Sequence, residues 1–260
     1  MTDTYSTRLG FAKFLAQEAG FLAQKLYRER EADFVSTKGL QDFVTQADRA
    51  VEAHIRSLLL RHFPSDAMLG EEDGLMGDSS SIWVVDPIDG TANYMRGLPD
   101  WAISIAFCWE GEPEVGVIFA PERNEMCWAV KGQGAFCNDQ PIQVSACAAP
   151  DQALLLLGRS ARGSLSAYLD LVRSVIDSEM EYRRNGSAAV SLMDVAQGRA
   201  EGYYEAHLNP WDALAGVIII REAGGIVRCA KGAEMLTAGS PVLALARNLD
   251  GKVLQTLAVE

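Results

Sequence analysis

The first quarter of the chain carries apolar residues at the spacing of a helix. Between residues 11 and 28, and again between 48 and 62, these residues recur three, four or seven positions apart. This spacing places them along one face of an α-helix. The pattern therefore predicts two amphipathic helices near the start of the chain.

Short apolar runs separated by turn residues follow in the middle of the chain. They predict a meander of four strands, over 103–109, 114–119, 126–130 and 134–137. Beyond residue 151, strand-like and helical patterns alternate. We predict strands near 154–157, 180–183, 202–205, 226–229 and 242–246, and helices over 165–176, 187–196, 211–223 and after 246. This alternation implies a layered α/β arrangement.

The chain thus divides into two halves without a linker, which we expect to form one compact unit. Residues 1–145 are predicted to be an α+β half and residues 146–260 an α/β half, so the fold class is α/β. A chain of 260 residues with 48% apolar residues can bury a large core. A site that uses motifs from both halves would lie between them.

Charge and cysteine content exclude several classes of function. The net charge of −12 argues against broad binding to nucleic acid or to anionic membranes. The five cysteines form no C-x-x-C pair and are expected to be reduced core residues. We find neither a signal peptide nor an apolar run of transmembrane length, and so expect a cytoplasmic protein.

The motif D-P-I-D-G-T at 86–91 carries the most chemical information. It follows the apolar run 82–85, which predicts a buried strand that ends at Asp86-Pro87. Two carboxylates, Asp86 and Asp89, then lie on a bent backbone with accessible carbonyl groups. Oxygen ligands of this kind suit Mg²⁺. The alternative is an ordinary turn with solvated carboxylates.

Two further acidic segments strengthen the metal interpretation, although each has a simpler explanation. The run G-E-E-D-G at 70–74 places three acids, among them Glu71, between glycines, and it could be a solvated loop. In the run N-P-W-D at 209–212, Asn209 suits a helix N-cap and Pro210 the first helical position. Asp212 would then complement the helix dipole without any metal.

Taken together, these three segments resemble the inositol monophosphatase family, a group of Mg²⁺-dependent, lithium-sensitive phosphomonoesterases. The resemblance runs from about residue 42 to 225, with the motifs in the family's order and at similar spacing. It implies a layered αβαβα sandwich of the sugar phosphatase type. The segment before Trp211 is closer to bacterial than to animal members.

The resemblance implies two Mg²⁺ sites. One would be formed by Glu71, Asp86 and the carbonyl of Ile88, and the other by Asp86, Asp89 and Asp212, so that Asp86 bridges them. A third, weaker Mg²⁺ is compatible with the same site. Two such ions can activate a water and stabilise both the attacking and the leaving oxygen.

A second implication concerns the attacking water. In the family, the aspartate that matches Asp48 accepts a hydrogen bond from the hydroxyl that matches Thr91, and Thr91 orients the water together with Glu71. In this chain Thr45 and Asp48 also form the [ST]-x-x-[DE] pattern of a helix cap. Because both uses draw on one carboxylate, we expect them to compete.

Substrate contacts are implied for a set of residues in both halves, namely Asp89, Gly90, Thr91, Arg183, Gly186, Ser187, Ala188, Glu205 and Asp212. Glu205 would accept hydrogen bonds from substrate hydroxyls. Arg183 aligns better than Arg184 with the family pattern, and its alternative is a solvated cation at a strand end.

We therefore expect a Mg²⁺-dependent phosphatase of a small phosphate monoester, with myo-inositol 1-phosphate as the favoured substrate. Histidinol phosphate, or another sugar or polyol phosphate, is the alternative within the same class. A different alternative is a regulatory protein with a partner in transcription, because some bacterial relatives have such roles. We expect a homodimer and no nucleic-acid or membrane partner.

Overall fold

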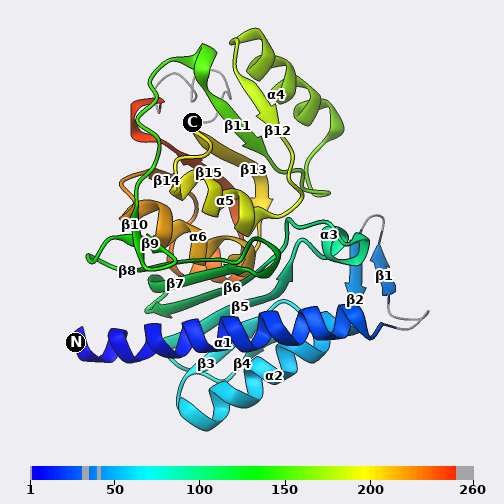
Figure 1. The fold of residues 1–260 in the computed structure, drawn as a ribbon, viewed down its shortest axis with the longest axis vertical. Coiled ribbons are helices and arrows are strands. Elements are labelled where there is room, and N and C mark those ends of the chain that lie inside the picture. The colour runs from blue at the N-terminus through cyan, green and yellow to red at the C-terminus, as the bar shows by residue number, and fades with distance from the viewer. Residues whose placement is uncertain (1, 31–34, 40–41, 250–260) are drawn as a thin grey trace.

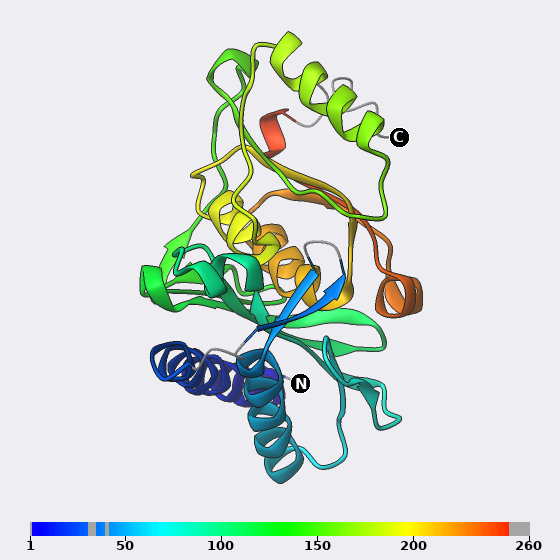
Figure 2. The ribbon, with the colours of Figure 1, turned by 90° about the vertical axis from the view of Figure 1, so that its right-hand side faces the viewer.

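Helices and sheets alternate in five layers (Figure 1). The computed structural model describes residues 2–30, 35–39 and 42–249. Figure 2 shows the layers from the side, with α1 (Thr2–Arg28) and α2 (Gln46–His62) at one end and α4 (Leu165–Asp177) at the other. An eight-stranded sheet, the pair α5 (Ala188–Ala196) and α6 (Pro210–Glu222), and a five-stranded sheet lie between them. The αβαβα prediction is confirmed.

The eight-stranded sheet is antiparallel apart from one parallel pair. Its order is β10-β9-β8-β7-β6-β5-β3-β4, and β3 runs parallel to β5. The strands are β3 (Ala67–Gly70), β4 (Gly74–Met76), β5 (Ser81–Asp89), β6 (Ala102–Trp109), β7 (Glu112–Ala120), β8 (Glu125–Val130), β9 (Ala135–Cys137) and β10 (Gln140–Ile142). The predicted meander from residue 103 to 137 is therefore present.

The five-stranded sheet has the order β12-β11-β13-β15-β14. Its strands are β11 (Leu154–Leu157), β12 (Glu181–Arg183), β13 (Gly202–Leu208), β14 (Ile226–Arg228) and β15 (Ser240–Leu245). β11 is parallel to both neighbours. The helix that follows it, α4, and the helix that follows β12, α5, lie on opposite faces of the sheet. The carboxyl ends of β11 and β13 thus form a topological switch point, the usual place for a ligand in such a sheet.

Alternation of apolar residues decides which face of β5 each helix covers. Trp83 and Val85 pack with α1 and α2, whereas Val84 packs on the opposite face with α5 and α6. α6 is buried on nearly all sides from Ala213 to Ile220, as expected of a helix between two sheets. A third core cluster fills the space between the five-stranded sheet and α4.

Several elements differ from the sequence predictions. β5 does not end at Pro87 but continues to Asp89, with its register against β6 shifted between Asp86 and Asp89. The missing N–H of Pro87 costs no pairing to β3, because the pairing of β5 with β3 has already ended at Val85. Seven short elements were not predicted from the sequence. They are β1 (Val35–Gly39), β2 (Asp42–Thr45), β3, β4, β10, α3 (Thr91–Arg96) and α7 (Gly232–Ala238).

Two sequence predictions remain without a structural test. The helix expected after residue 246 falls largely on 250–260, outside the described residues, and only a 3₁₀ turn over Arg247–Leu249 precedes that segment. The division near residue 145 falls between β10 and β11 and stays a prediction. Among the described helices, none is both long and apolar enough to cross a bilayer.

Candidate active site

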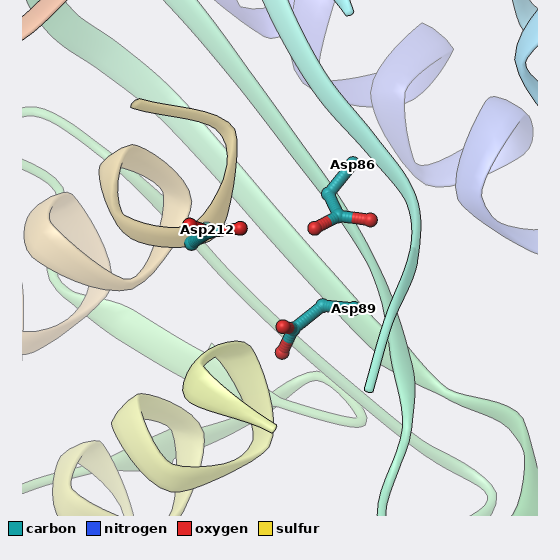
Figure 3. A group of neighbouring side chains, drawn as sticks. All are labelled: Asp86, Asp89 and Asp212. Carbon is teal, nitrogen blue, oxygen red and sulfur yellow. The ribbon is translucent and has the colours of Figure 1, made fainter. Parts of the chain in front are cut away.

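Three aspartates from two distant parts of the chain meet between the two sheets. Asp86 and Asp89 come from the end of β5, and Asp212 comes from the first turn of α6. One carboxylate oxygen of each lies within 4.8 Å of the others, in the arrangement of Figure 3. Asp86 is buried, with 1% of its surface exposed.

The register shift in β5 explains how two aspartates three residues apart face the same way. On a regular strand, residues i and i+3 point to opposite faces. Asp86 shares the face of Val84, towards α6, but Ile88 turns to the opposite core, beside α1 and α2. This irregularity returns Asp89 to the side of Asp86. The Ile88 N–H donates to Asp86 Oδ1 at 2.9 Å and fixes the bend.

The start of α5 holds Asp89. Its Oδ2 accepts from the backbone N–H of Ala189 at 2.6 Å and from the hydroxyl of Ser187, the N-cap of α5. Ser187 Oγ also accepts from the N–H of Val190 at 3.1 Å. A carboxylate at a helix N-terminus is favoured by the unpaired N–H groups and the helix dipole. The segment expected to face the substrate therefore also orients a predicted metal ligand.

Asp212 combines a capping role with its place in the acidic group. Its Oδ2 accepts from the Asn209 N–H at 2.9 Å, and Asn209 is the N-cap of α6, as predicted. The hydroxyl of Ser104 on β6 donates to the Trp211 carbonyl at 2.8 Å. This bond fixes the start of α6 against the eight-stranded sheet. Asp212 thus caps α6 and also belongs to the group of three aspartates.

Burial and mutual repulsion dominate the electrostatics of the acidic group. Burial raises the pKa of Asp86 well above its usual value, and repulsion by Glu71, Asp89 and Asp212 adds to the rise. Burial and repulsion by Asp89 likewise raise the pKa of Asp212 to about 7. A bound dication would offset both effects by supplying positive charge among the oxygens. Because Glu71 contributes to the raised pKa of Asp86, this predicted metal ligand also lies near the three aspartates.

Asp48 and Thr91 meet at the edge of the same site. The Thr91 hydroxyl lies 3.0 Å from Asp48 Oδ1 and 3.1 Å from the carbonyl oxygen of Ile88. Asp48 Oδ2 accepts from the N–H of Thr45 at 2.8 Å and completes a capping box at the start of α2. The expected competition between the two uses is therefore wrong, because each takes a different oxygen of the carboxylate.

A cavity of about 190 Å³ lies beside Asp89 and Asp212, at the switch point of the five-stranded sheet. Its lining includes the predicted Gly186, Ser187, Ala188 and Glu205. Gly90, the residue before α3, adopts φ 92°, and a Cβ there would lie 2.9 Å from the Asp100 carbonyl oxygen and 3.0 Å from Ser187 Cβ. A glycine is therefore required at the point where β5 passes the start of α5.

Glu205 forms one wall of this cavity. Its Oε2 accepts from the Tyr203 hydroxyl at 2.5 Å, and burial raises the pKa of the Glu205 carboxyl to about 7. Gly158, at the end of β11, makes room for it, since a Cβ there would lie 1.9 Å from Glu205 Oε2. Neither Tyr203 nor Gly158 was predicted from the sequence. The alternation of β13 could have indicated Tyr203, which shares a face with Glu205.

Arg183 does not line this cavity. It pairs with Glu181 at 2.8 Å on the surface of the edge strand β12, with 59% of its side chain exposed. Arg184 and Arg159 line the cavity instead, and the charge of Arg184 acts on Glu205. No signal in the sequence separates two adjacent arginines, because the facing of β12 decides which of them reaches the site.

Comparison with known proteins agrees with this geometry. The model of the inositol monophosphatase family matches residues 5–259. The Nus factor SuhB of Escherichia coli K12 is 40% identical over 223 residues, which cover 84% of each chain. The structure of the extragenic suppressor protein SuhB of Bartonella henselae has a TM-score of 0.90 and 34% identity, over 96% of this chain and 98% of that one. An IMPase of Thermotoga maritima has a TM-score of 0.86 and 30% identity, over 97% of both chains.

Proposed function

Because the chain belongs to the inositol monophosphatase family of phosphomonoesterases, we propose that it hydrolyses a small phosphate monoester with Mg²⁺, and that myo-inositol 1-phosphate is its preferred substrate. The observation that carries this proposal is the convergence of Asp86, Asp89 and Asp212 beside a polar cavity. Three carboxylates whose pKa values are all raised by burial are costly unless a cation neutralises them.

The donor set fits Mg²⁺. We assign one ion to Glu71, Asp86 and the Ile88 carbonyl, and a second to Asp86, Asp89 and Asp212. All of these donors are oxygens, which hard dications prefer over nitrogen or sulfur. When bound, Mg²⁺ would supply positive charge to the phosphate and acidify water at neutral pH.

The remaining steps belong to side chains of this chain. Thr91 has one hydroxyl proton, and donation to Asp48 leaves its lone pairs to accept from the attacking water. Together with Glu71, Thr91 would hold that water in line with the scissile bond. We keep a third, weaker Mg²⁺ as part of the proposal without assigning it ligands.

Leaving-group recognition is assigned to the cavity of the five-stranded sheet. Glu205 offers a carboxylate, positioned by Tyr203, that can accept from ring hydroxyls. Arg184, rather than Arg183, is the arginine that we assign to the substrate. Histidinol phosphate, the alternative, carries an ammonium group and is less well matched to a cavity lined by two arginines, Arg159 and Arg184.

A panel of phosphate esters tests the proposal. Purified protein should release phosphate from inositol 1-phosphate with Mg²⁺ and lose this activity in EDTA. Asp86→Asn should abolish turnover, whereas Asp139→Asn, which alters an exposed carboxylate paired with Lys13, should leave it unchanged. Faster hydrolysis of histidinol phosphate than of inositol 1-phosphate would overturn the substrate assignment. Wild-type turnover by Asp86→Asn would overturn the metal assignment.

A second candidate function rests on the similarity to a relative named as a Nus factor. We propose that a role in transcription accompanies catalysis in this chain. Copurification of RNA polymerase with tagged wild-type protein and with Asp86→Asn would test it. Equal recovery with both proteins, above a tag-only control, would support a binding role that is independent of turnover.

A further inference from the structure

We propose that Glu52, on α2, is a positioning residue that fixes the turn carrying Glu71 and thereby sets the affinity of the site for its divalent cation. The inference rests on the proposed function, because it takes Glu71 as a metal ligand. Glu52 lies outside the groups assigned above. With 1% of its surface exposed, it is one of the few charged residues that are buried in the described part of the chain.

The Glu52 carboxylate binds the backbone of the turn between β3 and β4. Its Oε2 accepts from the N–H of Glu72 at 2.8 Å, and its Oε1 accepts from the N–H of Asp73 at 3.1 Å. These two N–H groups directly follow Glu71 in the chain. One carboxylate therefore holds two consecutive peptide groups of the turn.

Gly70, on the other side of Glu71, contacts the same carboxylate. A Cβ at Gly70 would lie 2.4 Å from Glu52 Oε1 and 2.7 Å from Oε2. The carboxylate thus lies against the backbone immediately before Glu71 and is hydrogen-bonded to the backbone immediately after it. The backbone of Glu71 is held on both sides by a single side chain.

Arg56 balances the charge of Glu52. It follows Glu52 by one turn of α2, forms an ion pair with it, and also reaches Asp73 at 3.2 Å. Only 11% of the Arg56 side chain is exposed, so little solvent screens the pair. The protein can therefore bury a carboxylate beside an acidic turn without adding an unpaired negative charge to it.

The placement of Glu52 on α2 links the two parts of the site that act on the water. Asp48, which accepts from Thr91, lies four residues before Glu52 and hence on the same face of the helix. α2 is itself held by the burial of Val51, Ile55 and Leu59 against the eight-stranded sheet. One rigid helix thus positions both Thr91 and Glu71.

Glu52→Gln is the perturbation of choice, because it keeps the volume of the side chain. Glutamine retains one acceptor oxygen, but its NH₂ group would face a backbone N–H, and Arg56 would keep only Asp73 as a carboxylate partner. Loss of a residue that orients a metal ligand typically costs about 10- to 100-fold in metal affinity or activity. We expect the half-saturating Mg²⁺ concentration to rise by about tenfold or more.

Glu222 provides a matched control at the far end of α6. Its Oε1 and Oε2 accept from the N–H groups of Gly132 and Gly134, both at 2.8 Å. It thus holds a turn through two peptide groups, as Glu52 does, but that turn carries no predicted ligand. Glu222 lies ten residues, or about 15 Å, along the helix from Asp212. Glu222→Gln should leave the metal dependence unchanged.

Metal binding and turnover are measured separately. Binding of Mn²⁺, a probe with the octahedral preference of Mg²⁺, is followed by the loss of the free-ion EPR signal, and hydrolysis is titrated with Mg²⁺. Glu52→Gln should weaken Mn²⁺ binding and recover most of its kcat at high Mg²⁺, which a general folding defect would not allow. Gly70→Ala, which displaces the Glu52 carboxylate, should weaken Mn²⁺ binding in the same direction. It replaces Glu52→Gln as the test if Glu52→Gln fails to fold.

The outcomes separate this inference from the proposed function. Equal Mn²⁺ affinity in wild type, Glu52→Gln, Gly70→Ala and Glu222→Gln would overturn it. An equal loss of affinity in Glu52→Gln and Glu222→Gln would also overturn it, by showing a non-specific effect. Wild-type protein that binds Mn²⁺ but hydrolyses no ester would refute the proposed function, while the Mn²⁺ comparison would still decide the role of Glu52.

Discussion

Truncation of Glu205 to alanine should separate substrate recognition from catalysis. Glu205 lines the same cavity as Asp89 and Asp212 but is not one of the three clustered aspartates, and its carboxylate is already held by the Tyr203 hydroxyl at 2.5 Å. Substrate hydroxyls would therefore meet an acceptor that needs little reordering. An aryl phosphate has no such hydroxyls and would gain nothing from it.

The expected magnitude follows from the hydrogen bond that would be lost. Removing one partner from a buried polar contact costs about 1–3 kcal/mol. Since about 1.4 kcal/mol corresponds to a factor of ten in rate, kcat/KM for inositol 1-phosphate should fall by about ten- to a hundredfold. Tyr203→Phe keeps the carboxylate but removes its anchor, and should cost less than Glu205→Ala.

Phosphate release from inositol 1-phosphate and from 4-nitrophenyl phosphate provides the assay, at saturating Mg²⁺. Glu205→Ala should lower kcat/KM for the first ester and change that for the second by less than about threefold. Equal losses on both esters would refute the reasoning, because they would mean that Glu205 supports the metal site or the fold. Far-UV circular dichroism and Tm control for the integrity of the variants.

Four further results are expected. Asp212→Asn should raise the Mg²⁺ concentration needed for half-maximal rate, and an unchanged Mg²⁺ titration would mean that Asp212 acts as a helix cap alone. Thr91→Val should lower kcat by about a hundredfold at unchanged KM if its hydroxyl orients the water, and a parallel rise in KM would argue for a role in binding instead. Li⁺ at millimolar concentrations should inhibit in an uncompetitive or mixed manner, because it enters a Mg²⁺ site with half the charge; insensitivity would indicate a differently shaped second site. In EDTA, Tm should fall as pH rises from about 5 to 8. The pKa values of Asp86 and Asp212 are raised in the folded state, that of Asp212 to about 7, so the folded state keeps protons that the unfolded state has already lost. Mg²⁺ should raise Tm by more at pH 8 than at pH 5. Asp212→Asn should reduce the dependence of Tm on pH in EDTA, and a dependence as steep as that of the wild type would exclude Asp212 as its source.

Local patterns in the sequence were sufficient for most of the fold. The periodicity of 48–62 identified α2 to within a few residues, because apolar spacing directly reports which face of a helix is buried. The start of α6 was identified from Asn209 and Pro210 ahead of an apolar run. Short elements such as α3 and β4 escaped prediction, since three to six residues carry too little periodicity to stand out. The acidic motifs were visible as well, but each had an ordinary explanation as a turn or a cap.

Tertiary structure alone decided how those motifs combine. The shift in β5 that turns Asp86 and Asp89 to one side lies just beyond the end of its pairing with β3, in a register against β6 that involves residues far apart in the chain. Whether Asp48 could serve both a cap and Thr91 depended on the directions of its two oxygens. The sequence by itself determined which groups could bind a metal. Their convergence required the packing of two sheets around α5 and α6. The same packing decided that Arg184 and not Arg183 lines the cavity, because the direction of a side chain is set by contacts between residues far apart in the chain.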